Sequence, residues 1–145
     1  MTGRRAPHAV RARWIATALA AALAAGACSA WDVKEKSGDL EKAVEDYNKM
    51  VRWGRVSEAS GWVVPEDRSE FRETYGDAME KVRIADYEIQ EVLQDPANEN
   101  VATARIKIRY YRSPSVTVKT VRQNQEWTYR ADQEQWLVKP PPVLE

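Results

Sequence analysis

The hydrophobic period of this chain changes once, at Val82, and that change limits the folds open to it. Before Val82, apolar residues recur every three or four positions, which is typical of helices that bury one face. After Val82, apolar and polar residues alternate, which is typical of strands with one buried face. Helices followed by a run of antiparallel strands predict a single α+β domain.

The pattern also predicts where the elements lie. The first helix is expected to begin at Asp39, carry an apolar stripe through Leu40 and Tyr47, and end at Gly54. A short helix is expected at 56–59 and a third from about Ser69. Strands are expected at 84–94, 101–111, 116–130 and 135–139, with a bulge between Thr120 and Val121 where the alternation slips.

The first two strands can be paired from their side chains. With Gln94 opposite Val101, one face joins charged or polar partners and the other joins apolar ones. The polar pairs are Asp86–Arg109, Glu88–Lys107 and Gln90–Arg105, and the apolar pairs are Tyr87–Ile108 and Ile89–Ile106. This register favours a solvated, partly neutralised sheet face over an anion-binding patch.

The N-terminal segment has the features of an export signal. Residues 1–27 contain four arginines and no acid, and residues 14–27 are uncharged. The sequence Leu23-Ala-Ala-Gly-Ala-Cys28 resembles the lipobox of bacterial lipoproteins. That resemblance implies cleavage before Cys28, the lipidation site, and attachment of acyl chains such as palmitate to its thiol. The alternative is a free thiol in an uncleaved or differently cleaved leader.

The same resemblance implies a location and a division of the chain. In a host with two membranes, Ser29 after the cysteine favours the outer membrane over the inner one, with the domain facing the periplasm. We divide the chain into a cleaved signal peptide at 1–27, a lipidated N-terminus and tether at 28–38, a domain at 39–140 and a C-terminal tail at 141–145.

Composition excludes several functions for the mature chain. Without the four leader arginines, the chain has 18 basic and 22 acidic groups. This net negative charge argues against a nucleic-acid partner. The only histidine, His8, is in the leader, and the only cysteine is Cys28. Histidine-based nucleophile systems and ordinary zinc sites are therefore not expected, and no phosphate-binding glycine motif occurs. We expect no metal and no cofactor.

The order of these elements and several of their segments resemble a known family. "AVEDYNKMVRWGRVSEASGWV", "VRIADYEIQEV", "ATARIKIRYYR" and "QNQEWTYRADQEQWLV" are similar to the nuclear-transport-factor-2-like, or SnoaL-like, superfamily. The resemblance implies a cone in which N-terminal helices pack in a curved antiparallel sheet. It also implies a homodimer through the outer sheet face in some members and a monomer in others, and both are left open.

Ketosteroid isomerase, in the same superfamily, pairs an Asp base with a Tyr donor. The nearest analogues here are Glu91, at one of the alternating strand positions expected to face inward, and Tyr47 on the first helix. Their alternative interpretations are a carboxylate that reaches solvent and a core aromatic. A further set of aromatic residues either lines a ligand pocket, with Gln123 and Gln125 at its rim, or fills the core: Trp53, Trp62, Tyr87, Tyr110, Trp127, Tyr129 and Trp136.

Charge is uneven along the mature chain. Residues 28–99 hold an excess of acids, and residues 100–145 an excess of bases. This asymmetry indicates either complementarity inside the domain or a surface for a partner.

Together these observations predict a lipid-anchored, non-catalytic module that binds a small apolar ligand or an envelope protein. The alternatives are a small SnoaL-like isomerase or hydrolase acting on an apolar substrate, and a subunit of an envelope complex.

Overall fold

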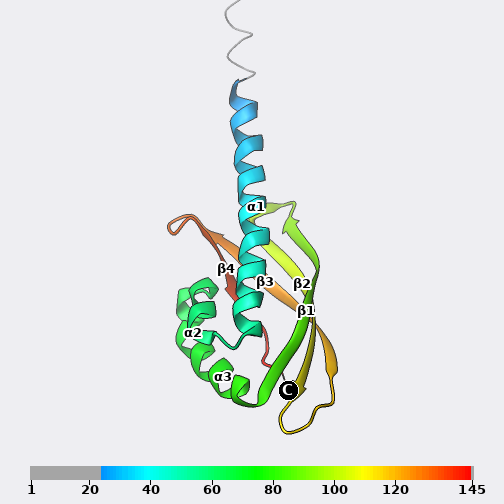
Figure 1. Cartoon of the computed structure of the whole chain (residues 1–145). Helices are drawn as coiled ribbons and strands as arrows, with labels where there is room; N and C mark the ends of the chain where they lie inside the picture. The colour runs from blue at the N-terminus through cyan, green and yellow to red at the C-terminus, as the bar shows by residue number, and fades with distance from the viewer. Residues whose placement is uncertain (1–23, 145) are drawn as a thin grey trace, which may run out of the picture. The chain divides into compact units, whose positions relative to one another are not determined.

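The computed structural model describes residues 24–144 and has three α-helices and one four-stranded sheet (Figure 1). The helices are α1 (Ala24–Arg52), α2 (Val56–Ala59) and α3 (Arg68–Lys81), with short 3-10 turns η1 (Ser60–Trp62) and η2 (Pro65–Asp67) between the last two. The strands are β1 (Val82–Asp95), β2 (Asn98–Arg112), β3 (Lys119–Arg130) and β4 (Gln135–Lys139). The change of period at Val82 therefore marks the junction of helix and sheet.

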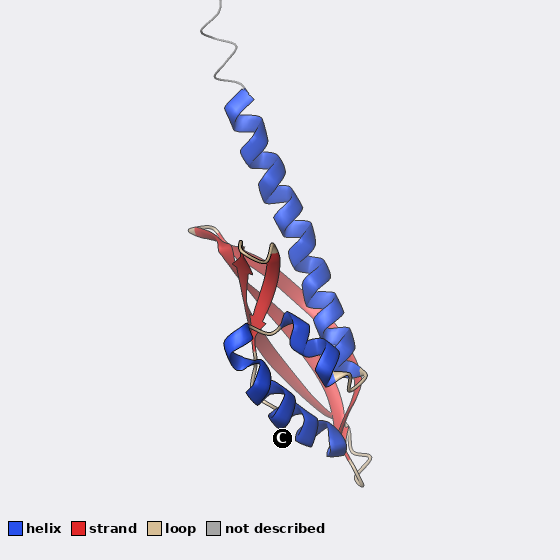
Figure 2. Ribbon diagram, turned by 90° about the vertical axis from the view of Figure 1, so that its left-hand side faces the viewer, coloured by secondary structure: helices blue, strands red, loops and turns tan. Residues whose placement is uncertain are grey.

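The sheet is an antiparallel meander in the order β1-β2-β3-β4. The helices lie on one of its faces, as Figure 2 shows for the compact unit that begins at Lys36. The core lies between the two layers, where Val44 of α1, Phe71 of α3 and Ile106 of β2 are almost completely buried. The expected α+β class is confirmed.

The first helix begins earlier than the sequence predicts. Its expected start at Asp39 is wrong, because helical backbone already runs through the residues assigned to the tether. Those residues include Lys34, Glu35 and Lys36, which are good helix formers, and a single glycine at position 38 costs only about 1 kcal/mol within a helix. Cys28 falls in this N-terminal part of α1, and residues 1–23 of the expected signal peptide lie outside the described residues.

The expected bulge between Thr120 and Val121 is also wrong. The register of β2 with β3 runs without interruption from Tyr110 opposite Lys119 to Val101 opposite Thr128. The apparent slip arose from Val116 and Val118, which lie before β3 and are 83% and 51% exposed. These two valines lie on one face in the sequence pattern, but they belong to no strand.

The irregularities lie instead in β1. Its register with β2 shifts between Ile84 and Asp86 and between Ile89 and Glu91. The pairs Asp86–Arg109, Glu88–Lys107, Tyr87–Ile108 and Ile89–Ile106 are confirmed. Two predicted pairs are wrong: Arg105 lies opposite Glu91 rather than Gln90, and Gln94 lies opposite Ala102 rather than Val101.

Candidate binding site

Aromatic side chains fill the space between the helices and the sheet. The rings of Tyr47 and Trp127 meet edge to face, with centroids 5.8 Å apart, and both residues are buried. Phe71 packs 6.2 Å from Tyr47 and 4.4 Å from Tyr75. Each such ring buries 150–250 Å². These four rings occupy the volume that a pocket in the cone would need.

The predicted aromatic set divides between the core and the surface. Trp127, Trp136 and Tyr110 are buried, and Tyr87, Tyr129 and Trp62 are partly buried against the core. Trp53 is 67% exposed, with the Arg52 guanidinium 5.2 Å from its ring. Core packing is therefore the main role of the set.

One polar pair crosses this core. Asn48 of α1 donates from Nδ2 to Gln125 Oε1 of β3 at 3.1 Å, and Gln125 Nε2 donates back to Asn48 Oδ1 at 2.8 Å. Asn48 Nδ2 also reaches the Val44 carbonyl at 2.7 Å. Both residues are buried, so each amide satisfies the other where water does not reach. This pair fixes how α1 lies on the sheet.

The space that remains beside this pair is small. A cavity of about 10 Å³ is lined by polar and apolar side chains of all the layers. That volume corresponds to about one water molecule, whereas ligand pockets measure about 300–1,000 Å³. Its lining residues are Tyr47, Asn48, Val51, Tyr75, Ile84, Tyr87, Ile108, Gln123, Gln125 and Leu144.

The tyrosines at this cavity are hydrogen-bond donors at neutral pH. Burial raises the pKa of Tyr47 well above its usual value, and the nearby Tyr75 hydroxyl adds to that rise. Burial also raises the pKa of Tyr75. The buried Tyr47 hydroxyl has no hydrogen-bond partner among the described residues. None of the described residues that line the cavity carries a carboxylate. The cavity therefore offers donors and amides but no general base.

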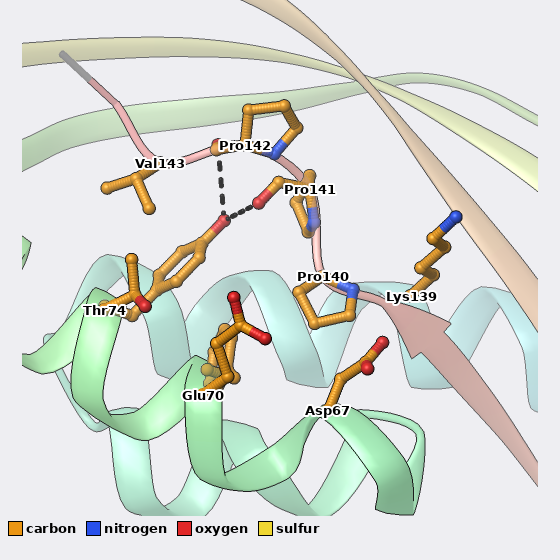
Figure 3. Close-up of a pocket in the computed structure, with 10 residues that line it drawn as sticks. Asp67, Glu70, Thr74, Lys139, Pro140, Pro141, Pro142 and Val143 are labelled. Atoms are coloured by element: carbon orange, nitrogen blue, oxygen red, sulfur yellow. Dashed lines mark hydrogen bonds between the residues drawn. The ribbon is translucent and has the colours of Figure 1, made fainter.

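The C-terminal segment closes the cavity from outside. The Tyr75 hydroxyl donates to the Pro141 carbonyl at 2.7 Å and lies 3.4 Å from the Pro142 carbonyl (Figure 3). Gln123 Nε2 donates to the Pro142 carbonyl at 3.0 Å, and Leu144 is only 6% exposed. Residues 140–144 thus pack as part of the domain.

The structure does not bring the two catalytic candidates to one site. Tyr47 lines the cavity, but Glu91 pairs with Arg105 at 3.0 Å on the other face of the sheet, where its side chain is 40% exposed. The expected inward orientation of Glu91 is wrong. The extra residue Gln90 in β1 reverses the alternation, so that Glu91 shares a face with Asp86 and Glu88.

The outer sheet face carries a ladder of ion pairs. Asp86–Arg109 and Glu88–Lys107 each close at 3.1 Å, beside the Glu91–Arg105 pair. All six side chains are about one-third exposed or more, so the pairs are screened and worth little individually. Their arrangement matches a solvated face neutralised by its neighbours, as the sequence predicts.

Sequence reasoning missed three features of this site: the Asn48 amide, the Gln90 bulge and the closing segment. A polar residue at position 48 on the apolar stripe of the first helix was a usable signal. The apolar residues Val143 and Leu144 after three prolines were another. No sequence signal distinguished Gln90 as the extra residue, because Gln90 and Glu91 are both polar.

In the described part of the chain, no helix combines the length and the apolarity that crossing a membrane requires. Within residues 24–144 no group of three or more His, Cys, Asp or Glu is placed to hold a metal ion.

The fold belongs to a known class: three helices on a curved four-stranded antiparallel sheet, as in ketosteroid isomerase-like proteins of the nuclear-transport-factor-2-like type. The comparison with protein-family models found no match, and neither did the comparison with curated proteins.

Two solved structures are similar to this chain in fold. A ketosteroid isomerase-like protein from Erwinia carotovora atroseptica is 17% identical, with a TM-score of 0.56 over 70% of this chain and 88% of that one. A SEC-C motif containing protein from Rhodopseudomonas palustris is 10% identical, with a TM-score of 0.57 over 71% of this chain and 77% of that one. At these identities the likeness is one of fold.

Proposed function

We propose that this chain is a lipid-anchored periplasmic protein whose α+β domain is a non-catalytic binding module. The domain binds a small apolar ligand or an envelope protein, and the acylated Cys28 holds it at a membrane surface. The two parts of the proposal, binding and anchoring, rest on different observations and are tested separately.

The filled interior supports the non-catalytic character of the proposed binding module. An enzyme of the isomerase type needs a carboxylate base in a desolvated pocket that admits its substrate. Here the cavity measures about 10 Å³, its described lining has no carboxylate, and Glu91 is paired with Arg105 on the outer face. The tyrosines that line the cavity have raised pKa values, so they cannot take a proton from a substrate at neutral pH.

The segment Leu23–Cys28 supports the anchoring part. A thiol at a new N-terminus needs no fold to position it, and attached acyl chains partition into a bilayer with about 0.8 kcal/mol per methylene. Because two or three chains together give stable attachment, such an anchor does not require a membrane-spanning helix.

Membrane fractionation in a bacterium with two membranes tests the anchoring. We expect the wild-type chain in the outer-membrane fraction and Cys28→Ala released from it or mislocalised. Ser29→Asp should move the chain to the inner membrane. Ser29→Ala is the matched control and should stay in the outer membrane. A Cys28→Ala chain that still sediments with the outer membrane would contradict the proposal.

The fold likeness to a ketosteroid isomerase-like protein supports the alternative of a small isomerase or hydrolase. That alternative requires a carboxylate to reach the cavity after a rearrangement. The envelope-complex alternative is tested by co-purification from detergent extracts, in which a stoichiometric partner would be recovered with the wild-type chain.

A further inference from the structure

The segment 140–144 is held by side chains rather than by the sheet. β4 ends at Lys139, and no backbone–backbone hydrogen bond joins residues 140–144 to other described residues. Its three prolines have no N–H to donate, so the contacts with Tyr75 and Gln123 both use its carbonyl oxygens. Release of this segment would therefore leave every strand pairing of the sheet intact.

This mode of contact is the one that grooves for proline-rich peptides use. Such grooves are lined by aromatic side chains and recognise a preformed extended helix through its carbonyls. Here Phe71 and Tyr75 form the wall on the α3 side, Pro141 is buried, and Leu144 enters the core as an anchor.

The segment also borders three hollows. A hollow of about 340 Å³ on the α3 side is lined by Tyr75 and by Pro140–Val143. A hollow of about 700 Å³ on the β2–β3 side is lined by Gln123 and by Pro142–Leu144. The internal cavity of about 10 Å³ shares Tyr75, Gln123 and Leu144 with them. The C-terminal segment is thus the common wall, and its removal joins the three.

The charges at one end of this groove favour a particular peptide. Asp67 and Glu70 line the α3-side hollow together with Lys139, the residue that precedes the prolines (Figure 3). In that picture both carboxylates lie on the helix side and face the proline run. In the same picture the Lys139 ammonium points away from both carboxylates, so these acids stay open to a basic residue of an incoming peptide.

We propose that this groove binds a proline-rich, apolar peptide segment of another polypeptide, with a basic residue before its prolines, in place of the chain's own residues 140–144. The inference rests on the proposed function as a binding module and names the class of partner. The C-terminal segment acts as a competitor in cis, so the groove is closed until it is displaced.

The test uses a fluorescently labelled peptide, Lys-Pro-Pro-Pro-Val-Leu, and fluorescence anisotropy on the full chain purified in detergent. Leu144→Asp removes the apolar anchor of the internal segment and should increase peptide affinity at least tenfold over the wild type. Val116→Asp, an apolar-to-acid change at an exposed residue that lines none of the three hollows, is the matched control and should leave the affinity unchanged. Adding Tyr75→Phe and Gln123→Ala to Leu144→Asp should lower the affinity at least tenfold.

A folded Leu144→Asp chain, judged by circular dichroism, that binds the peptide no better than the wild type would overturn the inference. If Leu144→Asp does not fold, Leu144→Ala keeps an apolar side chain and is judged by the same comparison. Failure of peptide binding in a chain that still fractionates with the membrane overturns the groove alone. If Cys28→Ala fractionates with the outer membrane as the wild type does, while the peptide still binds, only the anchoring part is overturned.

Discussion

Polar side chains that lie inside the core decide how tightly the helical layer is fixed to the sheet. Asn48 and Gln125 satisfy each other, whereas the hydroxyl of Tyr47 and the indole nitrogen of Trp127 have no hydrogen-bond partner among the described residues. The Asn48–Gln125 pair contributes stability only while both partners are present, whereas burial of the two unpartnered groups costs stability.

Asn48→Ala should lower the free energy of unfolding by about 2–3 kcal/mol, because it leaves the Gln125 amide buried without a partner. Urea unfolding followed by circular dichroism measures this change. The double variant Asn48→Leu with Gln125→Leu should recover most of the loss, since no polar group is then stranded. A single variant as stable as the wild type would contradict the role given to this pair.

The buried tyrosines make stability depend on alkaline pH. Burial raises the pKa of Tyr47 and Tyr75 in the folded state, so the unfolded chain loses these protons first as pH rises. Stability from this source is complete below about pH 10 and falls above it, by about 1.4 kcal/mol per pH unit for each tyrosine. Urea unfolding at pH 9, 10 and 11 measures the slope, and Tyr75→Phe should make it shallower. An equal slope in that variant would show that other groups cause the fall.

At the scale of the element, the bulge at Gln90 decides which side chains of β1 face the core. It keeps Ile89 and Val92 against the core while Glu91 turns to Arg105. A regular strand would place two of these three residues on the wrong face.

Deletion of Gln90 should therefore lower the free energy of unfolding by less than about 1 kcal/mol, because Ile89, Glu91 and Val92 then alternate regularly opposite Ile106, Arg105 and Ala104. Gln90→Ala keeps the extra residue and should cost less than about 0.5 kcal/mol, since this side chain is exposed. Thermal and urea unfolding of both variants provide the comparison. A deletion variant that loses several kcal/mol more than Gln90→Ala would contradict the assignment of Gln90 as the extra residue.

The elements that the sequence predicts are those with a regular period. The alternation of Ala104, Ile106 and Ile108 locates β2 and its buried face, and charge pairing then gives most of its register with β1. The bulge could not be predicted, because either Gln90 or Glu91 could oppose Arg105 by polarity alone. The start of α1 was missed because its first residues lack an apolar stripe, which is the signal the prediction used.

At the scale of the whole molecule, the acids of the first part of the chain and the bases of the second part are partly paired with each other inside the domain. Asp86–Arg109, Glu88–Lys107, Glu91–Arg105 and Glu66–Arg130 each join an acid of the first part to a base of the second. This favours internal complementarity over a partner surface as the origin of the asymmetry. The outer sheet face is accordingly a charged ladder, and a homodimer through that face stays a prediction.

The candidate site could be predicted only in part at this scale. The aromatic set and Gln125 were identified from the sequence, but whether they line a pocket depends on how the C-terminal segment packs. That packing joins Tyr75 to Pro141, residues far apart in the sequence, through one side-chain hydrogen bond. No local pattern encodes such a contact.

The proposed protein is a binding domain tied to a membrane through Cys28, and the covalent state of the mature chain tests this proposal most directly. Intact-mass measurement of the protein extracted from membranes should give a chain that begins at Cys28 and carries the added mass of a diacylglyceryl group. An unmodified chain that retains residues 1–27 would contradict it.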